Sequence, residues 1–338
     1  MIRPAACVQP RVDFKEILLR RARPMMGTLV GVSVRGHDRD ALEQSIHQVF
    51  AEMERLEAML SEWRSDSAVS RVNQSAGESP VRVPLELIEV LQVAGDVSRA
   101  TAGAFDSTWA SLSDMWRLDA PHFCPPAADA VGVARKLVDY RDVVLDVHAQ
   151  TVFLRRRGMR LGLGGIAKAY IAERAADLAA TSGVSHILVD AGGDVVARGR
   201  QGERPWTVGI RDPRSASHLL ATLDLQDEVV ATSGDYEHFV EVNGHRYHHL
   251  LDPRTGYPAL ASRSATVIAP HGAQAEALST ALFVLGPPGL ELLSAFAGTA
   301  AFLVDGHGLA HLTASGNTRF RLVGEDADVA GLPELRGS

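Results

Sequence analysis

The chain has 338 residues, a net charge of −7, 46% hydrophobic residues and 22% charged residues, which is the composition of an ordinary globular protein. Its longest basic block is the three arginines at 155–157, so nothing in the sequence indicates a nucleic-acid-binding surface. No apolar run reaches the length of a transmembrane helix, and the two cysteines, Cys7 and Cys124, are too few for a disulfide framework and lack the spacing of a metal site.

The N-terminus has no apolar segment of the kind that a secretion signal contains. The sequence as it stands therefore predicts a cytoplasmic protein, whereas a start site further upstream would make it periplasmic or membrane-associated. We expect residues 1–24 to form an irregular arm and residues 25–324 to form one domain, with a soft boundary between two subdomains near 121–126. Residues 325–338 are expected to be a loose tail.

The first half of the domain contains two well-marked helices. Thr28–Val34 alternates and is rich in β-branched residues, which predicts the first strand. Apolar residues then recur with a helical period from Asp40 to Leu60. A second helix is expected to begin at Pro84 and to end before Gly103, and Val143–Leu154 is typical of two short strands.

The second half is dominated by strands and hairpins. Asn243-Gly244 between two β-rich runs is the strongest hairpin signal in the chain, and Asp305-Gly306 marks another. Helices are few and separated, which favours an α+β fold with largely antiparallel sheets over a doubly wound sheet. The remaining predicted elements are helices at 166–182 and 275–285 and strands at 186–190, 206–211 and 264–269.

The segment LGLGGIAKAY at 161–170 places glycines and Lys168 at the start of a predicted helix. A helix N-terminus carries unpaired N–H groups and a partial positive charge, so it suits a phosphate, and Lys168 would add a full charge. The spacing matches neither a P-loop nor a dinucleotide-binding fingerprint. Taken alone, these glycines are equally explained by packing and turn formation.

The segment AEALSTALFVLG at 275–286 places Glu276, Ser279 and Thr280 on one face of a predicted helix, because they are three and four residues apart. A carboxylate and two hydroxyls are hard oxygen ligands of the kind that Mg²⁺ prefers. The alternative is an exposed polar stripe on an amphipathic helix.

Three further segments leave alternatives open. Trp63, in a polar loop, is either a core residue or a stacking platform for a ring. The run GAFD at 103–106 is either a helix–turn junction capped by Asp106 or a place where a flat ring approaches the backbone. The run HHLLDPRTGYPA at 248–259 is either an ordinary polar turn or part of a site. The motifs of triad hydrolases and zinc enzymes are absent from the sequence.

Taken in order, these segments resemble the ApbE family, the FAD:protein FMN transferases. No single block is decisive, but the ordered set from about residue 25 to about residue 305 is specific. The blocks are MGT at 26–28, SEWRSDSAVSRVN at 61–73, TAGAFDST at 101–108, LGLGGIAKAY at 161–170, AGGDVVARG at 191–199, TSGDYEHF at 232–239, HLLDPRTGYP at 249–258 and SATVIAPHGAQAEALSTALFVLG at 264–286.

The resemblance implies an ApbE-like fold and an enzyme that binds FAD and a divalent metal, usually Mg²⁺. Such enzymes transfer FMN from FAD onto a Thr or Ser hydroxyl of a partner flavoprotein and release AMP. Two alternatives are an FAD pyrophosphatase that forms FMN and AMP, and a flavin-binding protein without transfer activity.

The resemblance also assigns residues. The acceptor hydroxyl would be activated by His249, which has the most suitable ordinary pKa, or by a metal-bound acid, whereas the adjacent His248 should point to the opposite face and be expendable. Lys168 would meet the pyrophosphate. Cofactor-binding residues would be Met26, Trp63, Ala104, Phe105, Asp106, Gly164, Lys168, His249, Asp252 and Thr255, and the metal would be held by the Ala167 carbonyl with Glu276, Ser279 and Thr280.

This chain departs from the family pattern at four positions. The metal-binding carboxylate is commonly Asp in relatives but is Glu276 here, one CH₂ longer, which could alter metal preference because Mg²⁺ demands near-ideal geometry. Gly162 stands where Asp is usual. Ala169 replaces a common Gly, and Ser107 replaces a common Pro.

Overall fold

The centre of the protein is a nine-stranded sheet. The structure, a computed structural model, describes residues 16–323 and 329–331. Each strand is antiparallel to its neighbours except at the β17–β19 edge, which confirms the predicted α+β class. In sheet order the strands are β1 (Ile17–Met25), β2 (Thr28–Gly36), β6 (His186–Ala191), β7 (Asp194–Arg198), β10 (Glu228–Gly234), β15 (Ser262–Ala269), β16 (Ala300–Asp305), β17 (Ala310–Leu312) and β19 (Val329–Gly331).

Both ends of the described chain correct the sequence prediction. Residues 17–24 are not an irregular arm but most of β1, which pairs with β2 along its whole length. The strand was not predicted because the charged run RRARP lacks apolar alternation and ends in a proline. Charges and a proline are nevertheless tolerated at the edge of a sheet. Residues 329–331 of the predicted loose tail form β19. The predictions for 1–15 and for the rest of the tail lie outside the described residues.

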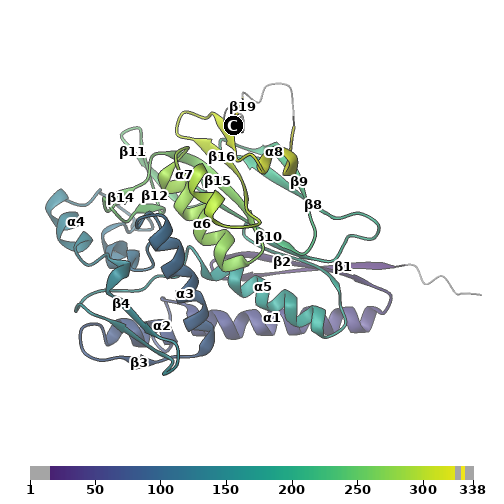
Figure 1. The fold of residues 1–338 in the computed structure, drawn as a ribbon, viewed down its shortest axis with the longest axis horizontal. Helices are drawn as coiled ribbons and strands as arrows, with labels where there is room; N and C mark the ends of the chain where they lie inside the picture. Colours follow the sequence, from purple (N-terminus) through teal and green to yellow (C-terminus); the bar gives the residue numbers. More distant parts are fainter. Residues whose placement is uncertain (1–15, 324–328, 332–338) are drawn as a thin grey trace, which may run out of the picture.

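Helices cover one face of the sheet (Figure 1). The predicted apolar stripe of α1 (Arg39–Leu60) is buried, α5 (Ala167–Thr181) packs beside α1, and α6 (Gly272–Leu285) packs against α5. α3 (Leu85–Ala100) packs in turn against α6. All four helices were predicted to within a few residues, and Gly286 ends α6 with a φ of 68°, as expected.

The opposite face carries a smaller sheet of β8 (Trp206–Asp212), β9 (Ser215–Leu225) and β18 (Phe320–Leu322). Successive side chains of a strand point to opposite faces of the sheet. The side chains of the main sheet therefore contribute to two hydrophobic cores, one on each face. In β10, for example, Val229 joins the helical core and Val230 joins the core beneath the smaller sheet.

The remaining elements form the periphery. The predicted hairpin at Asn243-Gly244 is confirmed, since both residues have positive φ (51° and 77°), as a type I′ turn requires. Residues 121–126 lie in a loop before α4. The other elements are α2 (Ala68–Gln74), β3 (Val81–Arg82), η1 (Trp109–Met115), α4 (Ala128–Arg135), η2 (Tyr140–Asp142), β4 (Val143–Asp146), β5 (Thr151–Leu154), β11 (Phe239–Val242), β12 (His245–His248), β13 (Leu251–Asp252), β14 (Tyr257–Pro258), α7 (Gly289–Leu292), η3 (Leu293–Ala295) and α8 (Gly316–Arg319).

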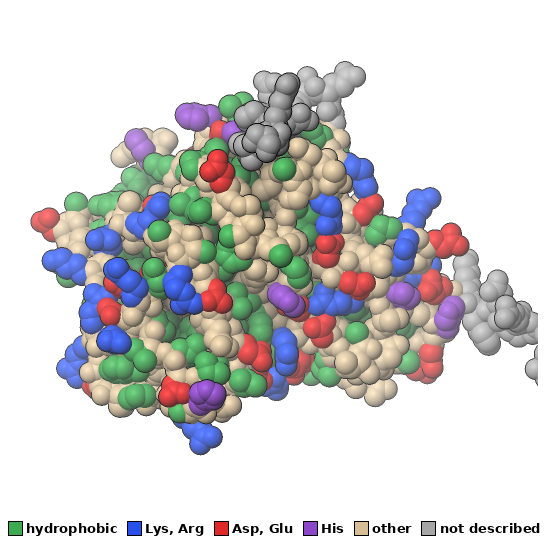
Figure 2. All heavy atoms as spheres, in the orientation of Figure 1, with side chains coloured by type: hydrophobic (Ala, Val, Ile, Leu, Met, Phe, Trp, Pro, Cys, Tyr) green, Lys and Arg blue, Asp and Glu red, His purple; other side chains and the backbone are tan. Residues whose placement is uncertain are grey.

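Charged side chains of both signs are interspersed over the face drawn in Figure 2, and neither sign forms a large block there. Among the described residues, no helix is both long enough and apolar enough to cross a membrane.

Candidate functional site

A cavity of about 830 Å³ opens where the start of α5, the middle of α6 and the segment after β12 converge. This is within the range of volumes typical of small-molecule sites. Asp252, Thr255 and Ser279 are predicted site residues that do not line it. The predicted residues that do line it are Met26, Trp63, Ala104, Phe105, Asp106, Gly164, Ala167, Lys168, His249, Glu276 and Thr280.

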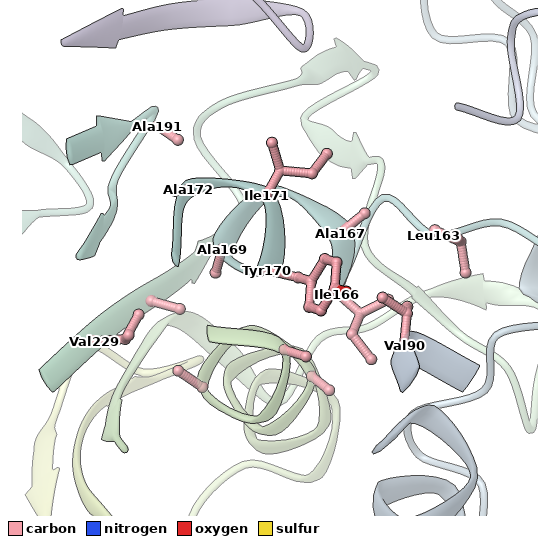
Figure 3. Close-up of a cluster of buried hydrophobic side chains, with 14 of the residues drawn as sticks. Val90, Leu163, Ile166, Ala167, Ala169, Tyr170, Ile171, Ala172, Ala191 and Val229 are labelled. Carbon is pink, nitrogen blue, oxygen red and sulfur yellow. The ribbon is translucent and has the colours of Figure 1, made fainter. Parts of the chain in front are cut away.

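The glycine-rich segment before α5 is anchored by its apolar residues. Leu163 and Ile166 are fully buried in the helical core, and Figure 3 shows them beside Val90 of α3 and the first turn of α5. Gly165 allows a close approach, because a Cβ there would lie 3.1 Å from Thr280 Oγ1. The glycines therefore serve packing, and they also bring the N-terminus of α5 to the cavity.

Lys168 lies in the first turn of α5, between two buried carboxylates. Its ammonium is 2.9 Å from Asp194 Oδ2 on β7 and is also ion-paired with Glu276 Oε1 on α6. The other oxygen of Glu276 accepts a 2.9 Å hydrogen bond from the Ala169 amide. Glu276 thus caps the start of α5, where the helix dipole favours an anion. Because the Lys168 side chain is 29% exposed, its charge remains accessible from the cavity.

The ionisation of this cluster follows from its burial. Burial disfavours the charged form of Lys168, but Asp194 and Glu276 outweigh it, so the pKa of the ammonium is raised and Lys168 stays protonated. Burial also raises the pKa of Glu276, and the Lys168 ammonium opposes that shift. One cation is therefore shared by two carboxylates, which leaves the cluster able to stabilise a further positive charge.

Oxygen donors for a metal meet at this cluster. The Thr280 hydroxyl lies 3.2 Å from the Ser233 hydroxyl on β10, and Ser279 Oγ lies 2.9 Å from the same atom. Ser279 is buried and also donates to the Glu276 carbonyl. No three His, Cys, Asp or Glu side chains of the described residues form a metal-binding group. The donor set of carboxylates and hydroxyls nevertheless suits a hard cation that also takes ligands from a substrate.

His249 lies directly after β12 and lines the same cavity as this cluster. Its Nδ1 is 3.3 Å from the His238 carbonyl, which can only accept, so Nδ1 carries the proton and Nε2 keeps its lone pair. The ring is accessible to water in the cavity, but the surrounding protein desolvates it and His238 disfavours a second charge. Together these lower the pKa of His249 to about 4, so the ring is neutral at pH 7 and able to accept a proton.

The neighbouring His248 points the other way, as strand alternation predicts, but it is not a free surface residue. It is 2% exposed, its Nε2 lies 2.8 Å from the Ala259 carbonyl, and its ring packs edge-on against Phe283 of α6. Burial lowers its pKa. We therefore expect His248 to contribute to stability, and its being expendable for the reaction stays a prediction.

The turn after His249 is stabilised from within and from outside. The Asp252 carboxylate accepts hydrogen bonds from the Arg254 amide and guanidinium, each 2.9 Å long. Thr255 Oγ1 accepts from the Tyr257 amide at 3.3 Å. Trp116 donates to the Gly256 carbonyl across 2.8 Å. Asp252 and Thr255 thus shape the turn that follows His249.

The outer wall of the cavity contains Met26 and Trp63. Met26 has a positive φ of 51° in the turn between β1 and β2, and its amide donates to Glu57 Oε1 at 3.0 Å. Trp63 is 76% exposed at the cavity and is not a core residue, which favours the stacking alternative.

The inner wall explains one departure from the family pattern. A Cβ at Gly162 would lie 2.9 Å from the Trp109 ring and 2.8 Å from Ala110, so no larger residue fits there. Trp109 also donates to the Gly162 carbonyl across 3.0 Å. Asp106 has a structural role in the same wall, since its carboxylate accepts from the Thr108 and Tyr140 amides, each at 2.8 Å. Burial raises its pKa.

Asp194, Glu62, Trp109 and His238 are among the cavity residues that the sequence reasoning did not assign to the site. Asp194 had a readable signal, because it is a carboxylate that begins the apolar run DVVA and is 2% exposed. A buried carboxylate requires a partner, which is Lys168 here. Glu62 and His238 fall within the SEWRSDSAVSRVN and TSGDYEHF blocks of the resemblance, but the sequence assigned neither side chain a role, and Trp109 lies in a 3₁₀ helix just outside those blocks.

A sequence model of the ApbE family matches residues 26–303. The chain is 35% identical over 303 residues to the FAD:protein FMN transferase of Treponema pallidum, a match that covers 84% of this chain and 83% of that protein. It is similarly 35% identical to an FAD:protein FMN transferase of Klebsiella pneumoniae, over 78% of this chain and 81% of that one. Among solved structures, the ApbE protein of Thermotoga maritima superposes with a TM-score of 0.82 at 30% identity, over 90% of this chain and 99% of the other. The flavinyl transferase ApbE of Pseudomonas stutzeri gives 0.79 at 30% identity, over 90% and 97%.

Proposed function

The chain belongs to the ApbE family and is an FAD:protein FMN transferase, and we propose that it moves FMN from FAD onto a Thr or Ser hydroxyl of a partner flavoprotein and releases AMP in a Mg²⁺-dependent reaction. The observation that carries this proposal is the arrangement of Lys168 and His249. A cation held between two buried carboxylates and a neutral histidine line one cavity.

The reaction replaces one phosphorus–oxygen bond by another. The acceptor oxygen bonds to the phosphorus on the flavin side of the pyrophosphate, and the bond from that phosphorus to the bridging oxygen breaks. The electron pair of the broken bond leaves with AMP. Such displacements depend mainly on positioning and on neutralisation of charge. In the proposal, Lys168 and the N-terminus of α5 supply positive charge to the pyrophosphate.

His249 takes the proton of the acceptor hydroxyl in this scheme. A neutral Nε2 is required for that step, and both the lowered pKa and the contact of Nδ1 with the His238 carbonyl support it. General-base assistance of this kind contributes about 10²- to 10⁴-fold. Protonated Lys168 cannot serve as the base, so its role is electrostatic.

A Mg²⁺ ion would be held by the side chains of Glu276 and Thr280, with the Ala167 carbonyl and Ser279 as further candidates. Asp194 extends this set, since it shares Lys168 with Glu276. When bound, the metal supplies further charge neutralisation at the phosphates. Ser279 would have to give up its contact with Ser233 to take part.

The proposal is tested by incubating the protein with FAD, Mg²⁺ and a flavin-acceptor domain. The acceptor should gain the mass of FMN, and AMP should appear in equal amount. AMP and FMN without a change in acceptor mass would contradict transfer and indicate hydrolysis. FAD that stays intact in the presence of acceptor would indicate binding alone. Replacement of the acceptor Thr or Ser by Ala is the control.

A further inference from the structure

The cavity contains a carboxylate that the proposed reaction does not use. Glu62 follows the end of α1 and lies on the inner wall, where its Oε2 accepts a long hydrogen bond of 3.4 Å from the Leu163 amide. The amides of Gly164 and of Glu62 itself also act on this carboxylate, and since a carboxylate has about four acceptor sites, capacity remains for a further donor. A group of this kind costs stability when it loses water, unless a donor reaches it.

Glu62 lies beside an aromatic ring whose position is fixed. A Cβ built on Gly164 would be 3.7 Å from Glu62 Oε1 and 3.9 Å from Trp109 Cζ2, so the two side chains flank the same glycine. The Trp109 indole is held by its bond to the Gly162 carbonyl. The inner wall thus presents a flat apolar surface with a carboxylate at its edge, which is a combination suited to a planar heterocycle.

We propose that Glu62 and Trp109 bind one of the two ring systems of FAD, with the Glu62 carboxylate accepting a hydrogen bond from a ring-edge N–H group. This inference rests on the proposed function for the presence of FAD. Both rings carry such a donor: adenine has its exocyclic amino group, and the isoalloxazine has its imide N–H.

Charge around Glu62 is consistent with this role. Burial raises the pKa of Glu62 although the amides of Leu163 and Gly164 and the charge of Arg160 oppose the shift. A donor at the ring edge would compensate the carboxylate for the water that it has lost. At Gly162, where Asp is usual in relatives, the Trp109 ring fills the space that a side chain would need. The carboxylate at this wall is therefore Glu62, from the loop after α1.

The test measures binding of two ligand pairs by calorimetry, without transfer. One pair is AMP and purine riboside 5′-monophosphate, which lacks the amino group. The other is FMN and its N3-methyl derivative. In the wild-type protein, the ligand without the N–H in one pair should bind roughly 10- to 100-fold more weakly, as expected for a hydrogen bond to a charged group. The pair that responds identifies the ring.

The ratio of the two dissociation constants within the responding pair should fall to near one in Glu62→Leu, which keeps the size of the side chain but removes its acceptor. Glu62→Gln, which keeps one carbonyl oxygen, should recover part of it. Glu291→Gln, an exposed carboxylate outside the cavity, is the matched control and should keep the wild-type ratio.

A wild-type protein that does not distinguish the members of either pair would overturn the inference, even if Glu62→Leu failed to fold. Ratios that stay the same in Glu62→Leu would overturn it as well. Because these measurements need no acceptor, their failure is separate from failure of the transfer assay.

Discussion

The two sides of the cavity hold their working groups in different ways. On the α5–α6 side, Lys168, Asp194 and Glu276 come from two helices and a strand of the main sheet and are joined by ion pairs. On the other side, His249 follows a short hairpin and is held through the His238 carbonyl. Fixed charge is thus built into helices and a strand, as preorganised electrostatics requires, whereas the proposed base lies in the loop after β12.

The adjacent histidines give the largest contrast. His249→Ala should slow transfer by about 10²- to 10⁴-fold, because the hydroxyl loses its base, with little change in stability. His248→Ala should instead lower the free energy of unfolding by about 2–4 kcal/mol, because it opens a cavity beside Phe283 and leaves the Ala259 carbonyl unpaired. Its folded fraction should still transfer FMN. AMP release and urea unfolding measure the two effects.

If His248→Ala instead slowed transfer and His249→Ala instead lost stability, the roles of the two histidines would have been assigned the wrong way round. Transfer by His249→Ala at the wild-type rate would remove the base from the mechanism.

The substitution Lys168→Met tests the α5–α6 side of the cavity. We expect AMP release to fall by about 10²- to 10³-fold, the effect typical of losing one preorganised charge contact. Stability should fall by about 3 kcal/mol, the lower end for breaking a buried ion pair, since the ammonium is partly exposed and two carboxylates lose their partner. Lys136→Met, an exposed lysine outside the cavity lining, should change neither quantity. Normal stability in Lys168→Met would argue against the shared ion pair.

The pH dependence of the reaction rate tests the His249 side of the cavity separately from the α5–α6 side. With saturating Mg²⁺ to keep Glu276 ionised, kcat/KM should be level between about pH 5 and 7, because His249 is already neutral in the free protein there. It should decrease as the pH falls through about 4, where the ring gains a proton and can no longer accept one. A rise near pH 6.5, the ordinary pKa of histidine, would contradict the desolvated ring. Initial rates of AMP release provide the measurement.

Much of the fold could be predicted because its signals are local. The apolar stripe of α1 and the Asn243-Gly244 turn each specify their own structure. β1 could not be predicted, since an edge strand needs no apolar alternation, and β19 has only three residues paired to a distant strand. Sheet order depends on such long-range pairing, which no short segment encodes.

The candidate site divides in the same way. Lys168 and Glu276 could be proposed from helix position, and the structure brings them together. The contact of Lys168 with Asp194 joins residues on different elements, so no spacing revealed it. Asp252 and Thr255 look like site residues in the sequence, yet their side chains bond within the turn, because Asp and Thr satisfy backbone groups as readily as they bind ligands.

The smallest expected effect concerns the turn that follows His249. Trp116→Phe removes the hydrogen bond to the Gly256 carbonyl but keeps a ring near Tyr247 and Tyr257, so stability should fall by only about 1–2 kcal/mol. If the turn positions His249, kcat should drop several-fold while FAD affinity stays unchanged, because the α5–α6 side is untouched. Trp206→Phe is the matched control: it loses a comparable bond, to the Arg198 carbonyl, on the opposite face of the sheet. Its stability should fall similarly with kcat intact, and equal losses of kcat in both variants would mean that the effect is general loosening and not positioning of the base.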